Sequence, residues 1–450
     1  MTPTLLRGLT SLALGALLAA PARAQEPVLV SLKDAVAQEV QSQGFTLPRA
    51  TKVHVYARGA ASRGLHPGPF YAYGWILDAR TREVVWQMDG RTSRPSRGLE
   101  VADAYLDLAA GSYEVYYANA TYSGRTFFSS WDLNLDRRNL DREEPRERRG
   151  FFDGLRARQL DRWRREAGWY GLELYLPGGD PGQVARFQAP LAWPGELVNL
   201  TGLGDGARRT QAFRLRRAMK VHVYAQGERV GSRDFADTAW IVDARTGQRV
   251  WELDDVKARF GGGAAKNRRQ VETLDLPAGD YVAGVATDGT HSPADWNGAP
   301  PCDPLLYGLI LSIPGAADAP FATRIETPAR GKVLAELVRV GNDQDLRATF
   351  ELKAAGTVRI LALGEGESDG EMADGGWIED AEGKRVWTLR REDTLPAGGA
   401  AKNRQAELRL ALPKGRYTLR YTTDGSHAYG HWNAAPPQEA ERYGLTVYAD

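Results

Sequence analysis

Residues 287–297 read TDGTHSPADWN, and residues 423–433 read TDGSHAYGHWN, 136 residues further along the chain. Upstream of each stretch, the sequence GAAKNR occurs at 263–268 and again at 399–404, with the same offset. A fixed period of this size indicates a chain built from repeated structural units. The repeat therefore predicts the domain organisation before any strand is assigned.

Tryptophans extend the repeat to the first part of the chain. Each copy contains three of them, and the first and third tryptophans of a copy are separated by 56, 56 and 55 residues. Nine of the twelve tryptophans fall in these triplets, so we interpret the N-terminal part as a divergent third copy. The triplets are Trp75, Trp86 and Trp131; Trp240, Trp251 and Trp296; and Trp377, Trp387 and Trp432.

Each copy has the pattern of short antiparallel strands. In residues 408–412 and 417–421, apolar and polar side chains alternate on either side of a Pro-Lys-Gly turn at 413–415. A period of two with one apolar face is typical of a half-buried strand. Turn signals separate about eight such strands per copy, so we predict an all-β chain of three tandem antiparallel β-sandwich domains of jelly-roll or immunoglobulin-like type.

The predicted domain boundaries follow the repeats. The first copy differs from the others by a charged insertion at 136–166, in which Phe152, Leu155, Leu160 and Trp163 recur at roughly helical spacing. We expect one amphipathic helix there, either solvated or docked on a partner. The predicted units are a signal peptide at 1–24, the first repeat at 25–180, the second at 181–316 and the third at 317–450.

The N-terminal residues resemble a secretory signal. Arg7 precedes an apolar run at 9–20, and Ala22-Arg23-Ala24 gives the small-x-small pattern of a cleavage site. The run is shorter than the roughly 20 residues that span a bilayer. We therefore expect an exported protein, periplasmic or extracellular, with no membrane span.

Charge and cysteine content exclude some partners. Without residues 1–24 the chain would have 56 basic and 57 acidic side chains, which gives no net field to attract nucleic acid. The single cysteine, Cys302, excludes an intrachain disulfide. Stability is therefore expected to come from apolar burial.

The order of turns and strands resembles a known family. An Asp-x-Gly hairpin, then Leu-Pro-x-Gly-x-Tyr, then a closing Tyr-Gly-Leu strand is similar to the bacterial pre-peptidase C-terminal jelly-roll modules. The resemblance implies a secreted, non-catalytic accessory β-sandwich. The Lys-Asn-Arg and Thr-Asp-Gly-x-His blocks are not part of that family's pattern, and this chain has no peptidase domain, so an accessory role would need a separate partner.

The repeated loops contain the candidate binding residues, and three interpretations remain open. Their polar groups could satisfy one another as a structural network, in which the Asp of Thr-Asp-Gly caps a turn and the block Lys266-Asn267-Arg268 pairs with Asp288. A tryptophan beside planar polar groups could instead stack on a glycan. The spacing Asp-x-x-His-x-x-x-Asp/His could hold a divalent cation, with zinc favoured over calcium by the imidazoles; the first copy, with Ser123, Thr126 and Ser130 at these places, could not. The candidates are Lys266, Asn267, Arg268, Asp288, His291, Asp295, Trp296, Asn297, Lys402, Asn403, Arg404, Asp424, His427, His431, Trp432 and Asn433.

The leading functional hypothesis is an exported, non-catalytic binding or structural protein that contacts a glycan or an extracytoplasmic protein through the two loop clusters. It predicts no obligatory cofactor and no nucleic-acid partner. The alternative is a metal-binding hydrolase that uses the Asp-x-x-His-x-x-x-Asp/His loops. No general base beyond the metal ligands stands out in the sequence, so the binding hypothesis is preferred.

Overall fold

The computed structural model describes residues 26–36, 38–61, 70–96, 98–120, 167–230, 234–245, 248–293, 296–327, 331–367, 370–434 and 436–449. Within these ranges the chain is all-β, which confirms the predicted fold class, and its strand pairs are antiparallel. The predicted signal peptide at 1–24, the helical insertion at 136–166 and the residues around Trp131 lie outside the described residues.

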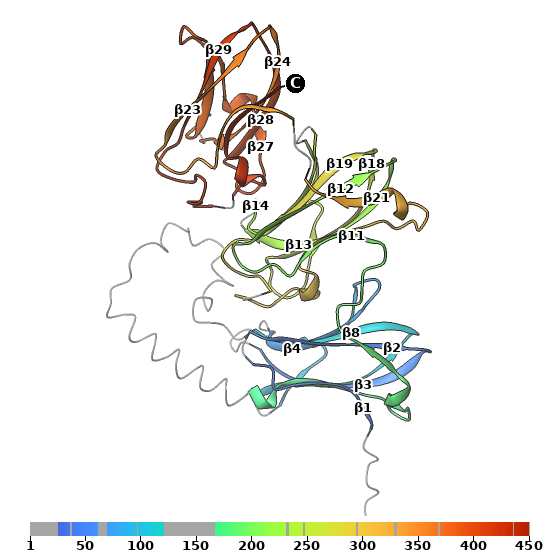
Figure 1. The fold of residues 1–450 in the computed structure, drawn as a ribbon. Coiled ribbons are helices and arrows are strands. Elements are labelled where there is room, and N and C mark those ends of the chain that lie inside the picture. The colour runs from blue at the N-terminus through green and yellow to red at the C-terminus, as the bar shows by residue number, and fades with distance from the viewer. Residues whose placement is uncertain are drawn as a thin grey trace, which may run out of the picture.

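The strands form three groups that follow one another along the molecule (Figure 1). The first strand group comprises β1 (Val28–Lys33), β2 (Val40–Leu47), β3 (Thr51–Ala61), β4 (Phe70–Asp78), β5 (Val84–Gln87), β6 (Arg94–Ser96), β7 (Leu99–Leu108), β8 (Gly111–Asn119), β9 (Gly171–Tyr175) and β10 (Ala185–Phe187). The second strand group comprises β11 (Glu196–Thr201), β12 (Arg208–Leu215), β13 (Met219–Val230), β14 (Asp234–Phe235), β15 (Thr238–Asp243), β16 (Arg249–Glu252), β17 (Arg259–Phe260), β18 (Asn267–Leu276), β19 (Gly279–Ala286), β20 (Gly308–Ser312) and β21 (Ala322–Ile325). The third strand group comprises β22 (Val333–Val338), β23 (Asp345–Leu352), β24 (Gly356–Glu365), β25 (Gly375–Glu379), β26 (Arg385–Thr388), β27 (Leu395–Pro396), β28 (Asn403–Leu412), β29 (Gly415–Thr422) and β30 (Gly444–Ala449).

Helical structure in the described residues is confined to single 3-10 turns between strands. They lie at Ala167–Trp169, Pro181–Gln183, Pro304–Leu306, Ala319–Phe321, Arg391–Asp393 and Ala440–Arg442. No helix in the described part of the chain has the length and apolar character needed to cross a bilayer.

The second and third groups share one sheet topology. In the second group, one sheet has the order β11-β20-β13-β18-β17 and the other β16-β15-β19-β12-β21. In the third group, the corresponding sheets are β22-β30-β24-β28-β27 and β23-β29-β25-β26. The first group has similar layers, but β3 also pairs with β4, which joins them into one sheet.

Two short edge strands extend the pairing beyond the predicted domain boundaries. β10 pairs with β2 of the first group, although it follows residue 180. β21 pairs with β12 of the second group, although it follows residue 316. The segments that follow residues 180 and 316 therefore contain pairing strands, which are short enough to escape a period-two search.

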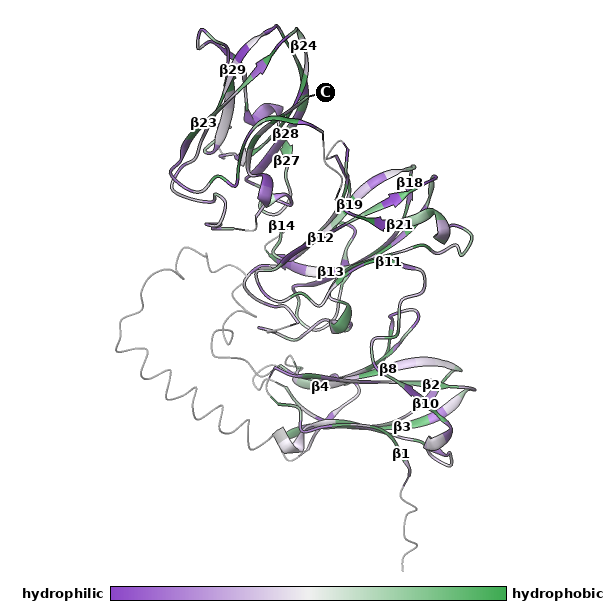
Figure 2. Cartoon of the chain, viewed as in Figure 1, coloured by the Kyte–Doolittle hydropathy of each residue, from purple (hydrophilic) through white to green (hydrophobic). Residues whose placement is uncertain are grey.

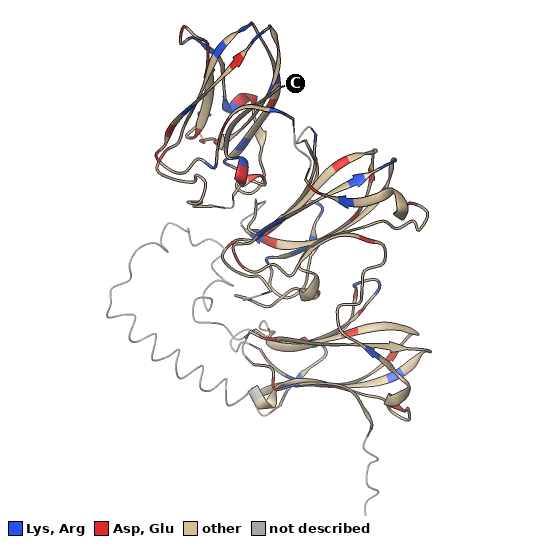
Figure 3. Ribbon diagram, viewed as in Figure 1, with Lys and Arg blue, Asp and Glu red and all other residues tan. Residues whose placement is uncertain are grey.

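The core of each group lies between its two layers. In the second group, Val221 and Val223 of β13 and Leu309 of β20 belong to the same buried cluster as Phe213 of β12 and Ile241 of β15. The predicted alternation is present in β29, where every second side chain is buried. Hydrophobic residues occur in strands of all three groups (Figure 2), and acidic and basic residues are distributed over all three (Figure 3).

Consecutive groups contact each other through one equivalent segment. Residues 299–306 of the second group lie against the first: Ala299 is part of the first group's buried core, and Cys302 packs against it. Trp75 Nε1 donates to the carbonyl oxygen of Cys302 at 2.7 Å. Residues 436–442 of the third group take the same place on the second, where Arg249 Nε donates to Gln438 Oε1 at 2.6 Å. The joints therefore repeat along with the sheets.

Candidate functional site

The imidazole of His291 is a buried structural group. Its Nε2 lies 2.6 Å from Asn267 Oδ1, while Asn267 Nδ2 donates to the carbonyl oxygens of Gly262 and Ala299. Because the amide nitrogen is already donating, His291 Nε2 must carry the proton and donate to Oδ1. Burial holds the pKa of His291 well below its usual value. The neutral, buried ring donates its Nε2 proton to Asn267 and so holds the loop in place. It is not exposed to act as a base on a ligand.

The backbone at this histidine supports the same conclusion. His291 has φ of 63° and His427 has φ of 53°, both in the left-handed region, which few residues other than glycine adopt, although histidine adopts it more often than most. The same conformation at equivalent repeat positions shows that the loop geometry is specified by the repeated sequence. The buried ring and its hydrogen bond offset the backbone cost.

Lys266 binds a residue that was not among the sequence candidates. Its Nζ lies 2.8 Å from Glu228 Oε1 and 2.5 Å from Asn297 Oδ1. Pairing with Asp288 was an expectation from the sequence, and the structure instead gives Lys266 the carboxylate at the end of β13. The difference arises because β13 pairs with β18, which brings the end of one strand beside the start of the other.

The loop of the third group repeats these contacts. His427 Nε2 lies 2.7 Å from Asn403 Oδ1, and burial lowers the pKa of His427 to about 4. Lys402 Nζ lies 2.8 Å from Glu365 Oε1 and donates to Asn433 Oδ1 at 2.5 Å. Two separate loops with identical internal bonding favour the structural-network interpretation for these polar groups.

The two repeated tryptophans differ in exposure. Trp296 is 4% exposed and lies edge-on to His291 and Tyr307, with ring centroids 5.0 and 5.1 Å away. Trp432 makes the equivalent contact with Tyr443 at 5.1 Å but is only half-buried. Trp296 is therefore a core residue, and of the two indoles only Trp432 presents a surface to a ligand.

Asp288 joins the loop to a second buried carboxylate. Its Oδ1 accepts from the backbone N–H of Thr290 at 2.8 Å, which is the predicted turn cap. Its own N–H donates to Asp237 Oδ1 at 2.8 Å, and Tyr307 donates its hydroxyl to Asp237 Oδ2 at 2.7 Å. The equivalents in the third group are Asp424, Ser426, Asp374 and Tyr443.

The buried carboxyl groups of Asp237 and Asp374 have raised pKa values. Burial raises the pKa of Asp374 to about 7, and burial raises the pKa of Asp237 well above its ordinary value. Neither residue was singled out from the sequence. A signal existed, because Asp237 and Asp374 are 137 residues apart, the same spacing as the repeated tryptophans Trp240 and Trp377.

The predicted Asp-His-Asp/His cation set does not assemble among the described residues. His291 and His427 direct Nε2 to an asparagine, His431 is exposed, and Asp295 lies outside the described residues. The triplets of potential ligand atoms that the described structure brings together contain only carboxylates. Among the residues that the structure describes, no histidine belongs to such a triplet.

The arginines of the Lys-Asn-Arg blocks point elsewhere. Arg268 Nε donates to Asp255 Oδ1 at 3.1 Å, and Arg404 Nε donates to Thr394 Oγ1 at 2.9 Å. Both contacts hold the strand β18 or β28 to the loop in front of it. These side chains thus stabilise the framework of the loop.

A hollow of about 560 Å³ lies between the second and third groups, and we call it the junction hollow. It unites candidate residues from both copies, with Asp288 from one and Trp432 and Asn433 from the other. Tyr429 and Glu441 also line it, and the tyrosine hydroxyl donates to Glu441 Oε1 at 2.8 Å. An apolar wall with a few polar groups and this volume is typical of small-molecule sites.

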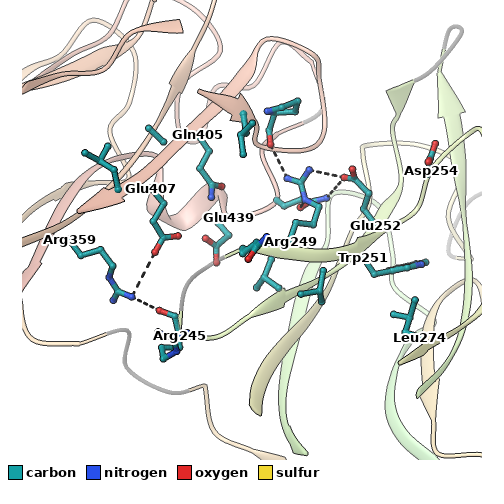
Figure 4. A pocket seen from close by; sticks show the side chains of 18 of the residues that line it. Arg245, Arg249, Trp251, Glu252, Asp254, Leu274, Arg359, Gln405, Glu407 and Glu439 are labelled. Carbon is teal, nitrogen blue, oxygen red and sulfur yellow. Dashed lines mark hydrogen bonds and ion pairs between the residues drawn. The ribbon is translucent and has the colours of Figure 1, made fainter. Parts of the chain in front are cut away.

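A second hollow of about 890 Å³ lies between the same two groups and has charged walls (Figure 4). Its charges largely neutralise one another: Arg249 Nη1 lies 2.9 Å from Glu252 Oε2, and Arg359 Nη1 lies 3.8 Å from Glu407 Oε1. Trp251 Nε1 donates to a glutamate of β18 at 3.0 Å. Basic and acidic side chains both line this hollow, so neither sign of charge dominates its walls.

Comparison with other proteins adds no family assignment. No protein-family model and no curated protein matches this chain. Any functional conclusion must therefore come from the contacts described above.

Proposed function

We propose that the chain is an exported, non-catalytic binding protein of three tandem jelly-roll-like β-sandwich domains, and that it recognises a glycan in the junction hollow. The observation that supports this proposal is that half-exposed Trp432 lines the same hollow as Asp288 and Asn433. A flat apolar ring beside carboxylate and amide groups complements a pyranose, which has apolar C–H faces and equatorial hydroxyls.

The proposal changes the expected number of sites. Two identical loop sites were predicted from the repeat, but Trp296 is buried and does not line the hollow. One site formed by both copies replaces two sites in parallel. One glycan is therefore expected to bind per chain, without avidity from two loops of the same chain.

Mutation of Trp432 tests the proposal. Glycan-array screening of the whole protein would identify the sugar, and isothermal titration would then compare wild type with Trp432→Ala. Loss of one stacking indole should weaken binding at least about tenfold, since a stacked or buried ring contributes more than about 1.4 kcal/mol. Trp377→Ala is the control, because Trp377 is also half-buried but is not among the residues that line the hollow.

Affinity that is unchanged in Trp432→Ala, or a complete absence of binding on the array, would refute the proposal. Circular dichroism of each variant separates a lost site from a lost fold. An effect of Trp377→Ala equal to that of Trp432→Ala would also count against it, since a site-specific loss would then be absent.

The resemblance to pre-peptidase C-terminal modules is compatible with this proposal, since such modules act as accessories to another protein. In that role the chain would hold a separate partner near a glycan-bearing surface. The hydrolase alternative gains no support from the contacts, because both loop histidines are engaged by asparagines.

A further inference from the structure

Each of the second and third groups contains three carboxylates whose oxygens lie within 4.8 Å of one another. The second-group trio is Glu228, Asp237 and Asp288, and the third-group trio is Glu365, Asp374 and Asp424. In each trio the glutamate lies within the last three residues of a long strand, β13 or β24. One aspartate directly precedes β15 or β25, and the other follows the threonine of the Thr-Asp-Gly loop. Pairing of β15 with β19 and of β25 with β29 brings the two aspartates of each trio together. The backbone N–H groups of Asp237 and Asp374 donate to the carbonyl oxygens of Glu228 and Glu365, which places each glutamate beside them.

The same position can be recognised in all three groups from a close approach of two backbone segments. In each group a glycine lies so close to a carbonyl group that a Cβ atom at the glycine would be 2.0 to 2.2 Å from its oxygen. The pairs are Gly59 with Ala72, Gly227 with Asp237, and Gly364 with Asp374.

This equivalence places alanines of the first group where the other groups have acids. Ala72 corresponds to Asp374, and Ala60, which follows Gly59, corresponds to Glu365. The strands β3 and β4 form around these alanines without the carboxylates. The sheets therefore do not require the acids, and burying carboxylates at this position opposes folding unless something compensates their charge.

Compensation within the third-group trio is incomplete. The ammonium group of Lys402 lies 2.8 Å from Glu365 Oε1, so one positive charge stands beside three carboxylates. The side chain of Glu365 is 9% exposed, and its Oε2 has no hydrogen-bond partner among the described residues. Both oxygens of Asp374 accept hydrogen bonds, from the Asp424 N–H and the Tyr443 hydroxyl, but neither donor is a cation. A buried carboxylate oxygen beside two further acids thus lacks a positive partner.

We propose that the third-group trio binds a divalent cation of the hard, oxygen-preferring class, of which Ca²⁺ is the best fit, and that the second-group trio is its repeat. Carboxylate oxygens are the ligands that Ca²⁺ prefers, and its flexible geometry tolerates a site completed by water. The carboxylates of Glu365 and Asp424 would bind the ion, while Lys402 keeps its bond to the other oxygen of Glu365. Asp424 is exposed, so the ion can enter from solvent.

The proposal is independent of glycan recognition, although Asp288 both belongs to the second-group trio and lines the junction hollow. It also differs from the metal site that the sequence suggested, because it uses Glu365 and Asp374 in place of histidines. The absence of imidazole favours calcium over zinc.

Calcium titration of the whole protein, after treatment with EDTA and its removal, tests the proposal. Isothermal titration with CaCl₂ should give two equivalents per chain, with affinities between micromolar and millimolar. Thermal unfolding should shift to higher temperature with calcium, because the ion binds the folded state. Glu365→Gln should remove one equivalent, and Glu228→Gln together with Glu365→Gln should remove both.

Asp345→Asn is the matched control, because Asp345 is an exposed acid paired with Arg420 outside the trios. It should retain both equivalents. If Glu365→Gln fails to fold by circular dichroism, Asp424→Asn at the exposed rim replaces it, and should remove the same equivalent. No heat and no thermal shift at millimolar calcium would overturn the proposal, and so would retention of both equivalents in Glu365→Gln or Asp424→Asn. A Trp432→Ala variant that loses glycan but keeps calcium would leave this inference standing, which keeps the two tests separate.

Discussion

Arg82 of the first strand group binds Asp303 of the second through two hydrogen bonds, Nε to Oδ2 at 2.8 Å and Nη2 to Oδ1 at 2.5 Å. Both side chains are 2% exposed. A second edge of the guanidinium group donates two hydrogen bonds to Glu114, from Nη1 to Oε1 and from Nη2 to Oε2. Tyr224 donates its hydroxyl to Asp303 Oδ2 at 2.6 Å. The joint between the two groups thus contains a buried ionic cluster rather than a solvated linker.

Removal of Arg82 should destabilise this joint strongly. Arg82→Ala leaves Glu114 and Asp303 buried without their counter-ion, and breaking a buried ion pair in this way costs about 3–5 kcal/mol. Urea unfolding followed by tryptophan fluorescence would measure the loss. Arg214→Ala is the control, since Arg214 forms an exposed pair with Asp280 and its loss should change stability little. A small effect of Arg82→Ala would show that the joint does not depend on the cluster.

The stability contributed by His427 should depend on pH. Its pKa is about 4 in the folded chain and near 6.5 when unfolded, so between these values the unfolded state binds the proton more readily. Stability due to the neutral ring is full above about pH 6.5 and falls as the pH drops toward 4, by about 3 kcal/mol.

Comparison of wild type with His427→Gln isolates this effect. The pKa of Asp374 is shifted in the opposite sense, so its contribution increases as the pH falls, but it is present in both proteins. The free energy of unfolding, measured by urea at pH 7 and at pH 4.5, should therefore decrease more on acidification in wild type than in His427→Gln. Equal decreases would contradict a buried neutral ring at this position.

The two repeated indoles should respond differently to truncation. Trp296→Ala removes a ring that is almost wholly buried and should reduce the free energy of unfolding by about 3–5 kcal/mol. Trp432→Ala removes a half-buried ring, so the loss should be clearly smaller. Urea unfolding of both variants under one condition gives the comparison. A larger loss in Trp432→Ala would reverse the assignment of core and surface roles.

The close approach at Gly364 can be tested with a second glycine of the same strand. A Cβ at Gly364 would lie 2.2 Å from the carbonyl oxygen of Asp374, so Gly364→Ala forces the backbone segments apart and should cost about 1–3 kcal/mol. Gly356, at the start of β24, has no atom within 4 Å of the place that an alanine methyl group would occupy, so Gly356→Ala should be within about 0.5 kcal/mol of wild type. Thermal unfolding of the two variants distinguishes the outcomes, and similar values would contradict the close contact.

The sequence predicts the fold class well because its signals are local and repeated. The alternation at 417–421 marks a half-buried strand, and the structure has β29 there. The first two tryptophans of each copy also lie in strands. The site was predicted less well. Asn267, His291 and Trp296 do come together, but Glu228 and Asp237 are brought in by pairing between distant strands, which a search for motifs within one loop cannot detect.

The contacts between groups gave no signal in the sequence at all. Cys302 and Gln438 occupy the same repeat position, yet one supplies a backbone carbonyl to Trp75 and the other a side-chain amide to Arg249. Each is matched to the surface that receives it. Complementarity between two surfaces cannot be read from either one alone.

Ala299 completes the core of the first strand group, although it follows the last strand of that group by more than a hundred residues. A chain shortened after β10 would lack Asp303, and it would expose Trp75 and Glu114, the remaining acidic partner of Arg82, to water. Every strand of that unit would nevertheless be present. A segment of the second unit completes the core of the first, so synthesis from the ribosome would leave the first unit unfinished until the second has emerged.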